Sequence, residues 1–202
     1  ENAGEVLGRL GAATAVPAIV ELVRTGEDRL HRKAVDALIG IGAPAVDSLI
    51  PLLAEEGEGQ AGAAAALTGI GAPALEPLVG ALGSENSSIR MGAARVLEQL
   101  GWAPEPGTKE EIVSLIALQR WPDVAEIGAP AVEFLVPLLG DLDPAVQAGA
   151  MEALAGIGAP AVPPLILQLG RKALRDPAIE ALVRIGDAAV EPLILALEKA
   201  RL

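Results

Sequence analysis

The sequence predicts an all-α fold, an α-solenoid of about six two-helix repeats with one irregular repeat in the middle. The first observation is a ladder of glycines at positions 11, 42, 71, 101, 128, 158 and 186, whose spacings run from 27 to 31 residues. The second is the composition: 51% of the residues are hydrophobic but only 1% are aromatic. Such a chain suits thin layers of closely packed helices, which bury their apolar faces by stacking.

The segment around each of these glycines resembles a junction between two helices. Residues 41–46 read Ile-Gly-Ala-Pro-Ala-Val, and close copies begin at Ile70, Ile127, Ile157 and Ile185, with weaker copies at Leu10 and Leu100. We expect the glycine just past a helix end in a left-handed conformation. The proline should then occupy the first position of the next helix, with an acid in its first turn.

Helix A follows each junction and helix B precedes it. The apolar residues of helix A fall at helical spacing, as in the set Val46, Leu49, Ile50, Leu53 and the set Val132, Leu135, Val136, Leu139. The corresponding residues of helix B are smaller, as in the set Leu30, Ala34, Ala37, Leu38, Ile41 and the set Ile89, Ala93, Val96, Leu97, Leu100. We expect these faces to form the core, with helix B close to its neighbours.

We predict one repeat domain over residues 1–202, with regular repeats at 1–101 and 129–202 and an irregular repeat at 102–128. Thr108 and Glu111 predict a capping box that opens a helix to about Gln119. Trp121-Pro122 should break this helix and leave a short one over residues 123–127. Half repeats are expected at both ends, a partial helix B at residues 3–11 and a helix A at 187–200, which favours a longer array or end-to-end self-association.

The Gly-Ala-Pro-Ala-Val-x-x-Leu-x-x-Leu pattern of helix A, together with Arg90–Leu97 in helix B, resembles the short HEAT-like repeat first noted in phycobilisome lyases. The resemblance covers nearly the whole chain. It implies a right-handed α–α superhelix in which the B helices line the concave side. It does not select a function, because proteins with these repeats range from scaffolds to lyase subunits.

The composition excludes several kinds of active site. The chain has no Cys and one His, so disulfides, thiolate nucleophiles and the familiar zinc sites are excluded, and we expect no catalytic, cofactor or metal site. His31 shares its position, eleven residues before the glycine, with Gln60, Arg90, Gln147 and Arg175. We therefore predict a polar contact between neighbouring repeats. Trp102 and Trp121 either fill the gap left by the irregular repeat, which we favour, or form a stacking platform for a tetrapyrrole.

The net charge of −12 disfavours nucleic acid and anionic membranes as partners. Because no apolar run reaches the roughly 18 residues of a membrane span and no leader is apparent, we expect a cytoplasmic protein.

The exposed face of the B helices is the candidate partner-binding surface. Projection at about 100° per residue places the positions ten, six and three before each junction glycine opposite the core. In the first half these are Arg32, Asp36, Ile39, Ala61, Ala65, Thr68, Met91, Arg95 and Glu98; in the second half they are Ala148, Glu152, Ala155, Asp176, Glu180 and Val183. The second half is acidic, so a basic protein segment with apolar anchors would fit, although an ordinary solvated face gives the same pattern. We expect a non-catalytic scaffold; the alternative is a subunit of a bilin lyase-like enzyme.

Overall fold

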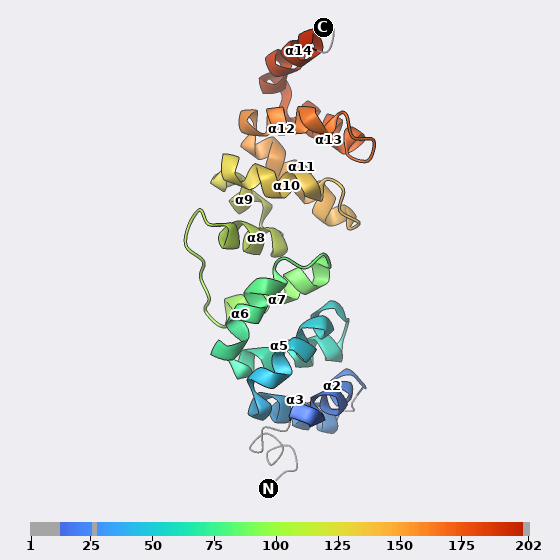
Figure 1. Cartoon of the computed structure of the whole chain (residues 1–202), viewed down its shortest axis with the longest axis vertical. Helices are drawn as coiled ribbons and strands as arrows, with labels where there is room; N and C mark the ends of the chain where they lie inside the picture. The colour runs from blue at the N-terminus through green and yellow to red at the C-terminus, as the bar shows by residue number, and fades with distance from the viewer. Residues whose placement is uncertain (1–12, 26–27, 200–202) are drawn as a thin grey trace. The chain divides into compact units, whose positions relative to one another are not determined.

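The computed structural model describes residues 13–25 and 28–199. The chain divides into two compact units, Glu1–Pro104 and Glu105–Leu202, which are described one at a time. In the described ranges every regular element is a helix or a short 3₁₀ turn (Figure 1). The prediction of an all-α fold is confirmed. The prediction of one continuous domain with a right-handed superhelix stays a prediction.

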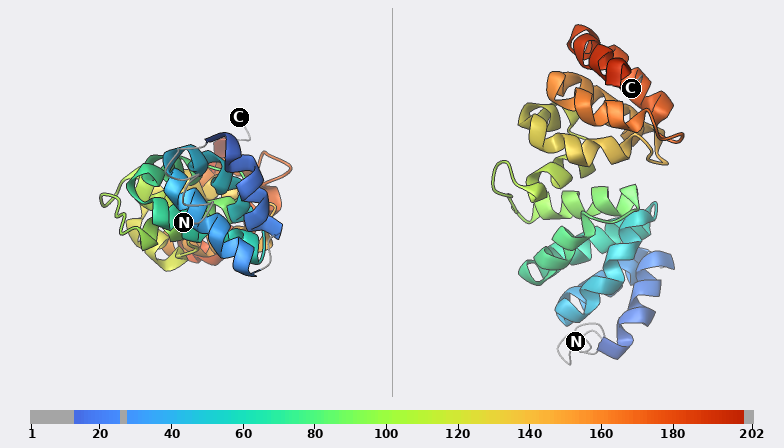
Figure 2. Two further views of the ribbon diagram at one scale, coloured as in Figure 1. Left: turned by 90° about the horizontal axis from the view of Figure 1, so that it is seen from below. Right: turned by 45° about the horizontal axis from the view of Figure 1, so that its top comes forward.

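In its described residues, 13–25 and 28–104, unit 1 contains three consecutive helix pairs. The A elements are η1 (Ala13–Ala15) with α2 (Val16–Thr25), then η2 (Ala43–Ala45) with α4 (Val46–Leu49) and η3 (Ile50–Ala54), then η4 (Ala72–Ala74) with α6 (Leu75–Ala81). The B helices are α3 (Asp28–Ile41), α5 (Glu58–Ile70) and α7 (Ser87–Gln99). Helices α3, α5 and α7 pack side by side in chain order, and each also contacts an A element (Figure 2). The three B helices therefore form one layer.

Unit 2 has the same two-layer arrangement. Its A elements are α8 (Lys109–Ala117), η5 (Ala129–Ala131) with α10 (Val132–Leu138), η6 (Ala159–Ala161) with α12 (Val162–Gln168), and η7 (Gly186–Ala189) with α14 (Val190–Lys199). Its B helices are α9 (Trp121–Ile127), α11 (Pro144–Ile157) and α13 (Arg175–Ile185). Contacts run from α9 to α11 to α13 in the B layer and from α10 to α12 to α14 in the A layer. The predicted partial helix B at residues 3–11 lies outside the described residues.

The junctions confirm the role of glycine and correct its conformation. At Gly42, Gly71, Gly128, Gly158 and Gly186, φ lies between 71° and 78° and ψ between −129° and −138°. This is the mirror image of the extended region rather than the left-handed helical one, and side chains are excluded from it still more strictly. At the first four junctions the proline lies inside a 3₁₀ turn of sequence Ala-Pro-Ala that precedes the α-helix, not at the first α-helical position.

The predicted apolar faces form the core, with one exception. Leu49, Leu53, Leu135 and Leu139 of the A elements are 0% exposed, and Ala93 and Leu97 of α7 are equally buried. Leu30 is 52% exposed, so its assignment to the core was wrong. Its helix α3 has no preceding B helix in the described part of the chain. By contrast α11, which carries the equivalent Val146 (3% exposed), also packs against α9.

The irregular repeat follows the predicted capping but not the predicted break. The Thr108 hydroxyl accepts a hydrogen bond from the Glu111 N–H, while the Glu111 carboxylate accepts one from the Gly107 N–H, one residue earlier than in a standard capping box. Helix α8 ends with Gln119 at φ 56°, stabilised by a bond from the Arg120 N–H to the Leu115 carbonyl. Trp121-Pro122 does not break a helix; it begins α9, because proline is tolerated in a first turn.

Candidate interaction surface

The B surface of unit 1 comprises the nine predicted residues Arg32, Asp36, Ile39, Ala61, Ala65, Thr68, Met91, Arg95 and Glu98. All nine are exposed or partly exposed, and they lie on three helices that pack side by side. Ile39 is partly covered because it packs against Gly69 of α5, where an added Cβ would overlap the Ile39 side chain. Ile39 therefore contributes to packing between repeats. Met91 is the other large apolar side chain of this surface, and it too is partly exposed.

The B surface of unit 2 comprises Ala148, Glu152, Ala155, Asp176, Glu180 and Val183. All are exposed except Ala155, which is partly exposed, and they lie on the adjacent helices α11 and α13. Val183 is 73% exposed and is the one large aliphatic side chain among these six residues. The structure thus exposes one large apolar side chain and three acidic ones on two adjacent helices.

The charges of the two B surfaces differ. In unit 1 two basic residues, Arg32 and Arg95, accompany two acidic ones. In unit 2 the carboxylate of Glu180 lies 2.7 Å from the guanidinium of Arg184, one helical turn away. Glu152 and Asp176 have no ion-pair partner within the described ranges. The acidic stripe predicted from the sequence is therefore partly neutralised at Glu180.

Four of the five polar residues that lie eleven positions before a junction glycine bond to the end of the preceding A element. The Gln60 amide donates to the Leu53 carbonyl (2.9 Å), and the Gln147 amide donates to the Leu139 carbonyl (2.6 Å). His31 follows the same pattern, since its Nδ1 lies 3.0 Å from the Val23 carbonyl and must carry the proton there. Arg175 donates in the same way to the carbonyl of Leu169, the C-cap of α12, whereas Arg90 donates to the carbonyls of Ser84 and Glu85 in the loop after α6. These bonds lie within one repeat, which corrects the predicted contact between repeats; His31 in addition lies 3.9 Å from Glu58 of the next repeat.

The structure favours the packing role of the tryptophans. Trp121 is 9% exposed, and a Cβ added at Gly149 of α11 would overlap its indole ring. The ring therefore fills space between α9 and α11 and has no free face for stacking. Trp102 is partly buried in unit 1, where its backbone N–H donates to the Leu97 carbonyl.

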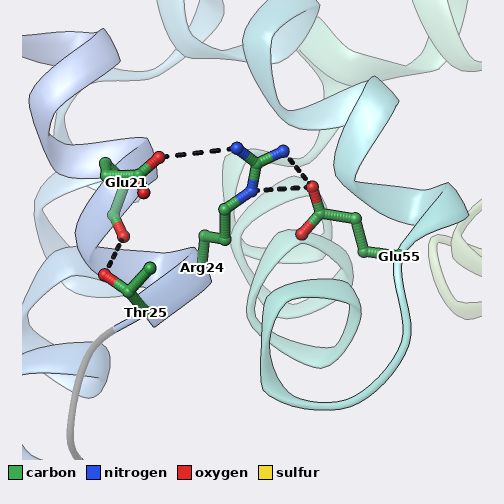
Figure 3. A network of polar contacts seen from close by, with 4 residues as sticks. All are labelled: Glu21, Arg24, Thr25 and Glu55. Atoms are coloured by element: carbon green, nitrogen blue, oxygen red, sulfur yellow. Dashed lines mark hydrogen bonds and ion pairs between the residues drawn. The ribbon is translucent and has the colours of Figure 1, made fainter.

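A surface network in unit 1 joins two successive A elements (Figure 3). The Arg24 guanidinium, on α2, forms a hydrogen-bonded ion pair with the carboxylate of Glu55, just after η3, and lies 3.5 Å from Glu21 on its own helix. The hydrogen bond with Glu55 raises the pKa of Arg24 above its already high ordinary value. An exposed pair of this kind contributes little stability.

Three hollows on the surface were missed by the sequence analysis. A pocket of about 700 Å³ lies on α10 and α12, and one of about 410 Å³ occupies the equivalent place on α4, η3 and α6. A third, of about 390 Å³, is mostly apolar and is lined by residues of α13, η7 and α14. Near it Ile194 and Leu197 of α14 are 51% and 67% exposed; end-to-end association stays a prediction. The available signal for the first pocket was the unusual Pro163-Pro164 pair in a predicted helix.

Two negative findings apply to residues 13–25 and 28–199. No group of three His, Asp or Glu side chains there is placed to hold a metal ion. No single helix is long and apolar enough to cross a membrane, although two bent pairs, Glu58–Ile70 with Ala72–Ala81 and Pro144–Ile157 with Ala159–Gln168, reach the required length and composition together.

Comparison with known proteins gives one match. A family model described as "PBS lyase HEAT-like repeat" matches residues 146–169 and 174–199. Each matched segment contains most of a B helix, its junction and the following A helix. No curated protein matches the chain. Residues 146–199 are therefore similar to HEAT-like repeats, and the same succession of B helix, glycine junction and A helix recurs in unit 1.

Proposed function

We propose that the chain is a non-catalytic scaffold that binds a segment of a partner protein along the B surface, chiefly that of unit 2. The observation that carries the proposal is the placement of Val183, 73% exposed, on the same face as the acidic residues of α11 and α13. An exposed aliphatic side chain within a polar rim is a common arrangement in protein interfaces.

The charge of this surface suggests the chemistry of the partner. Glu152 and Asp176 carry negative charges that no ion pair compensates among the described residues, while Glu180 is paired with Arg184. A segment with an apolar side chain for Val183 and basic side chains on either side would complement it. The basic groups would mainly speed association, and salt would weaken their effect.

The test is affinity capture from an extract of the source cells, with the chain as bait and mass spectrometry as readout. Replacing Glu152→Lys and Asp176→Lys together should weaken binding of a captured partner by about tenfold or more. The matched control is Glu76→Lys with Glu191→Lys, exposed first-turn acids of A helices. These should leave binding unchanged at a small cost in stability. Loss of the partner with the control pair but not with the B-surface pair would contradict the proposal.

The name of the matching family favours a second candidate, a lyase-like subunit that handles a bilin. The burial of Trp121 counts against this candidate, because its ring was expected to form a stacking platform together with Trp102. A bilin titration separates the two functions, because a lyase-like subunit should change the absorbance spectrum of the pigment and a scaffold should leave it unchanged.

A further inference from the structure

The pocket on the A helices of unit 2 has an unusual supply of hydrogen-bond acceptors. Its volume of about 700 Å³ falls in the range of small-ligand and peptide sites. Its walls include Glu133 and Pro137 of α10, and Pro160 and Pro164 from η6 and α12. The prolines matter because they have no N–H to donate to the helix.

The two helices leave carbonyl groups of the pocket residues without their usual donors. In an α-helix the carbonyl of residue i accepts from residue i+4, and in a 3₁₀ turn from residue i+3. Pro137 cannot donate to the carbonyl of Glu133. The carbonyl of Pro160 lacks both donors, because residues 163 and 164 are both proline. Pro160 therefore offers an acceptor that its own helix cannot satisfy.

Gln168 adds a further acceptor to the same pocket. Its Nε2 donates to the Pro164 carbonyl at 3.2 Å. Because a carbonyl oxygen can only accept, the amide nitrogen must face Pro164, and this leaves Oε1 as the other atom of the amide. That oxygen is buried and has no hydrogen-bond partner in the part of the chain that the structure describes. A buried acceptor without a donor is costly.

Two opposite charges flank these acceptors. Glu133 and Arg171 line the pocket, both are exposed, and neither forms an ion pair among the described residues. A ligand that fits must therefore bring donors and positive charge to one wall, and negative charge to the Arg171 side.

We propose that this pocket binds a peptide segment that presents a basic side chain next to a carboxylate. The basic group donates to the Pro160 and Glu133 carbonyls and pairs with the Glu133 carboxylate. The carboxylate of the peptide accepts from Arg171. The site lies on the A helices, so it is distinct from the B surface of the proposed function.

The equivalent pocket of unit 1 serves as an internal comparison. Ser84 and Ala81 occupy the places of Arg171 and Gln168, thirteen and ten residues after the junction glycine. Pro77 removes only the i+4 donor of its helix, because Glu76 before it keeps its N–H. This pocket is smaller, about 410 Å³. It has no counterpart of the Arg171 cation, and no carbonyl there lacks both its i+3 and its i+4 donor as that of Pro160 does. It should therefore not bind the same peptide.

The test is an NMR titration of the ¹⁵N-labelled full chain with acetyl-Ala-Leu-Arg, which has a free C-terminal carboxylate. We expect amide signals of α10 and of residues 168–174 to shift, while those of residues 81–84 stay in place. Two matched probes remove one group each: the citrulline peptide removes the positive charge, and the C-terminal amide removes the carboxylate. Each should bind at least about tenfold more weakly, which corresponds to about 1.4 kcal/mol.

Three variants test the residues on the protein side. Glu133→Gln and Arg171→Ala should each weaken binding of acetyl-Ala-Leu-Arg, and Pro164→Ala should do so by restoring an N–H for the Pro160 carbonyl. Circular dichroism checks that each variant remains folded. The proposal is overturned if the peptide shifts no signals, if residues 81–84 respond equally, or if all three folded variants bind as the parent does. Glu152→Lys with Asp176→Lys should leave this titration unchanged, so the outcome is independent of the proposed function.

Discussion

Gly149 of α11 lies against the indole ring of Trp121, where any added Cβ would overlap it. Gly62 and Gly92 occupy the same position of their repeats, nine residues before the junction glycine. A Cβ at Gly62 would lie 2.5 Å from His31, and one at Gly92 would lie 2.8 Å from Leu53. Because these glycines have no Cβ, a side chain of the preceding repeat can pack directly against their backbone. The junction glycines could be predicted from their spacing, but these could not, because the contact depends on a neighbour far away in the sequence.

Gly149→Ala should therefore destabilise the chain. The methyl group forces the Trp121 ring out of its place, and overpacking of this kind costs about 1–3 kcal/mol. The measurement is the free energy of unfolding in urea. The matched control is Gly80→Ala in α6, where an added Cβ meets nothing within 4 Å; it should leave stability unchanged or raise it by up to about 1 kcal/mol. If both variants unfold at the same urea concentration, Trp121 does not occupy the space beside Gly149.

At the scale of the elements, the helix pair is held by its caps as well as by its core. Thr108 and the apolar spacing of the A helices were enough to predict where helices lie, since capping and periodicity are local properties. The partner of the polar residue in the first turn of each B helix was not predictable, because the end of the preceding A helix is fixed by packing. The start of α9 at Trp121 was missed for a related reason: a proline that ends one helix can equally begin the next.

Gln147 provides a test of this capping. Its amide donates to the carbonyl of Leu139, a residue that is 0% exposed. Gln147→Leu keeps the size of the side chain but leaves that carbonyl without its donor, which should cost about 1–3 kcal/mol in urea unfolding. Gln147→Arg should keep most of the stability, because Arg175 donates from the same position of its repeat to the carbonyl of Leu169, the residue equivalent to Leu139. Equal losses for both variants would show that size, rather than the hydrogen bond, matters at residue 147.

At the scale of the whole molecule, the two units have separate cores. The buried cluster of unit 2 runs from Ile112 to Ala189 and includes no residue of unit 1. Unit 1 has its own fully buried leucines, among them Leu53, Leu67 and Leu97. The repeat pattern predicts the stacking of neighbours within a unit. It does not predict the division near residue 104, because the glycine spacing there, 27 residues, differs little from the others.

Separate cores predict that each unit folds without the other. Glu105 is exposed in the helix-free segment between α7 and α8, which is longer than the loops that hold the exposed Glu56 and Glu85, so a glutamate-specific protease should cut readily after Glu105. Each fragment contains about three helix pairs, the number at which a stack can bury a continuous core. We expect both purified fragments to keep their helical circular dichroism and to unfold cooperatively in urea. A fragment that loses its helical signal after separation would show that its core depends on contacts across the cut. The chain would then have to be treated as a single cooperative stack, as the unbroken succession of junctions predicts.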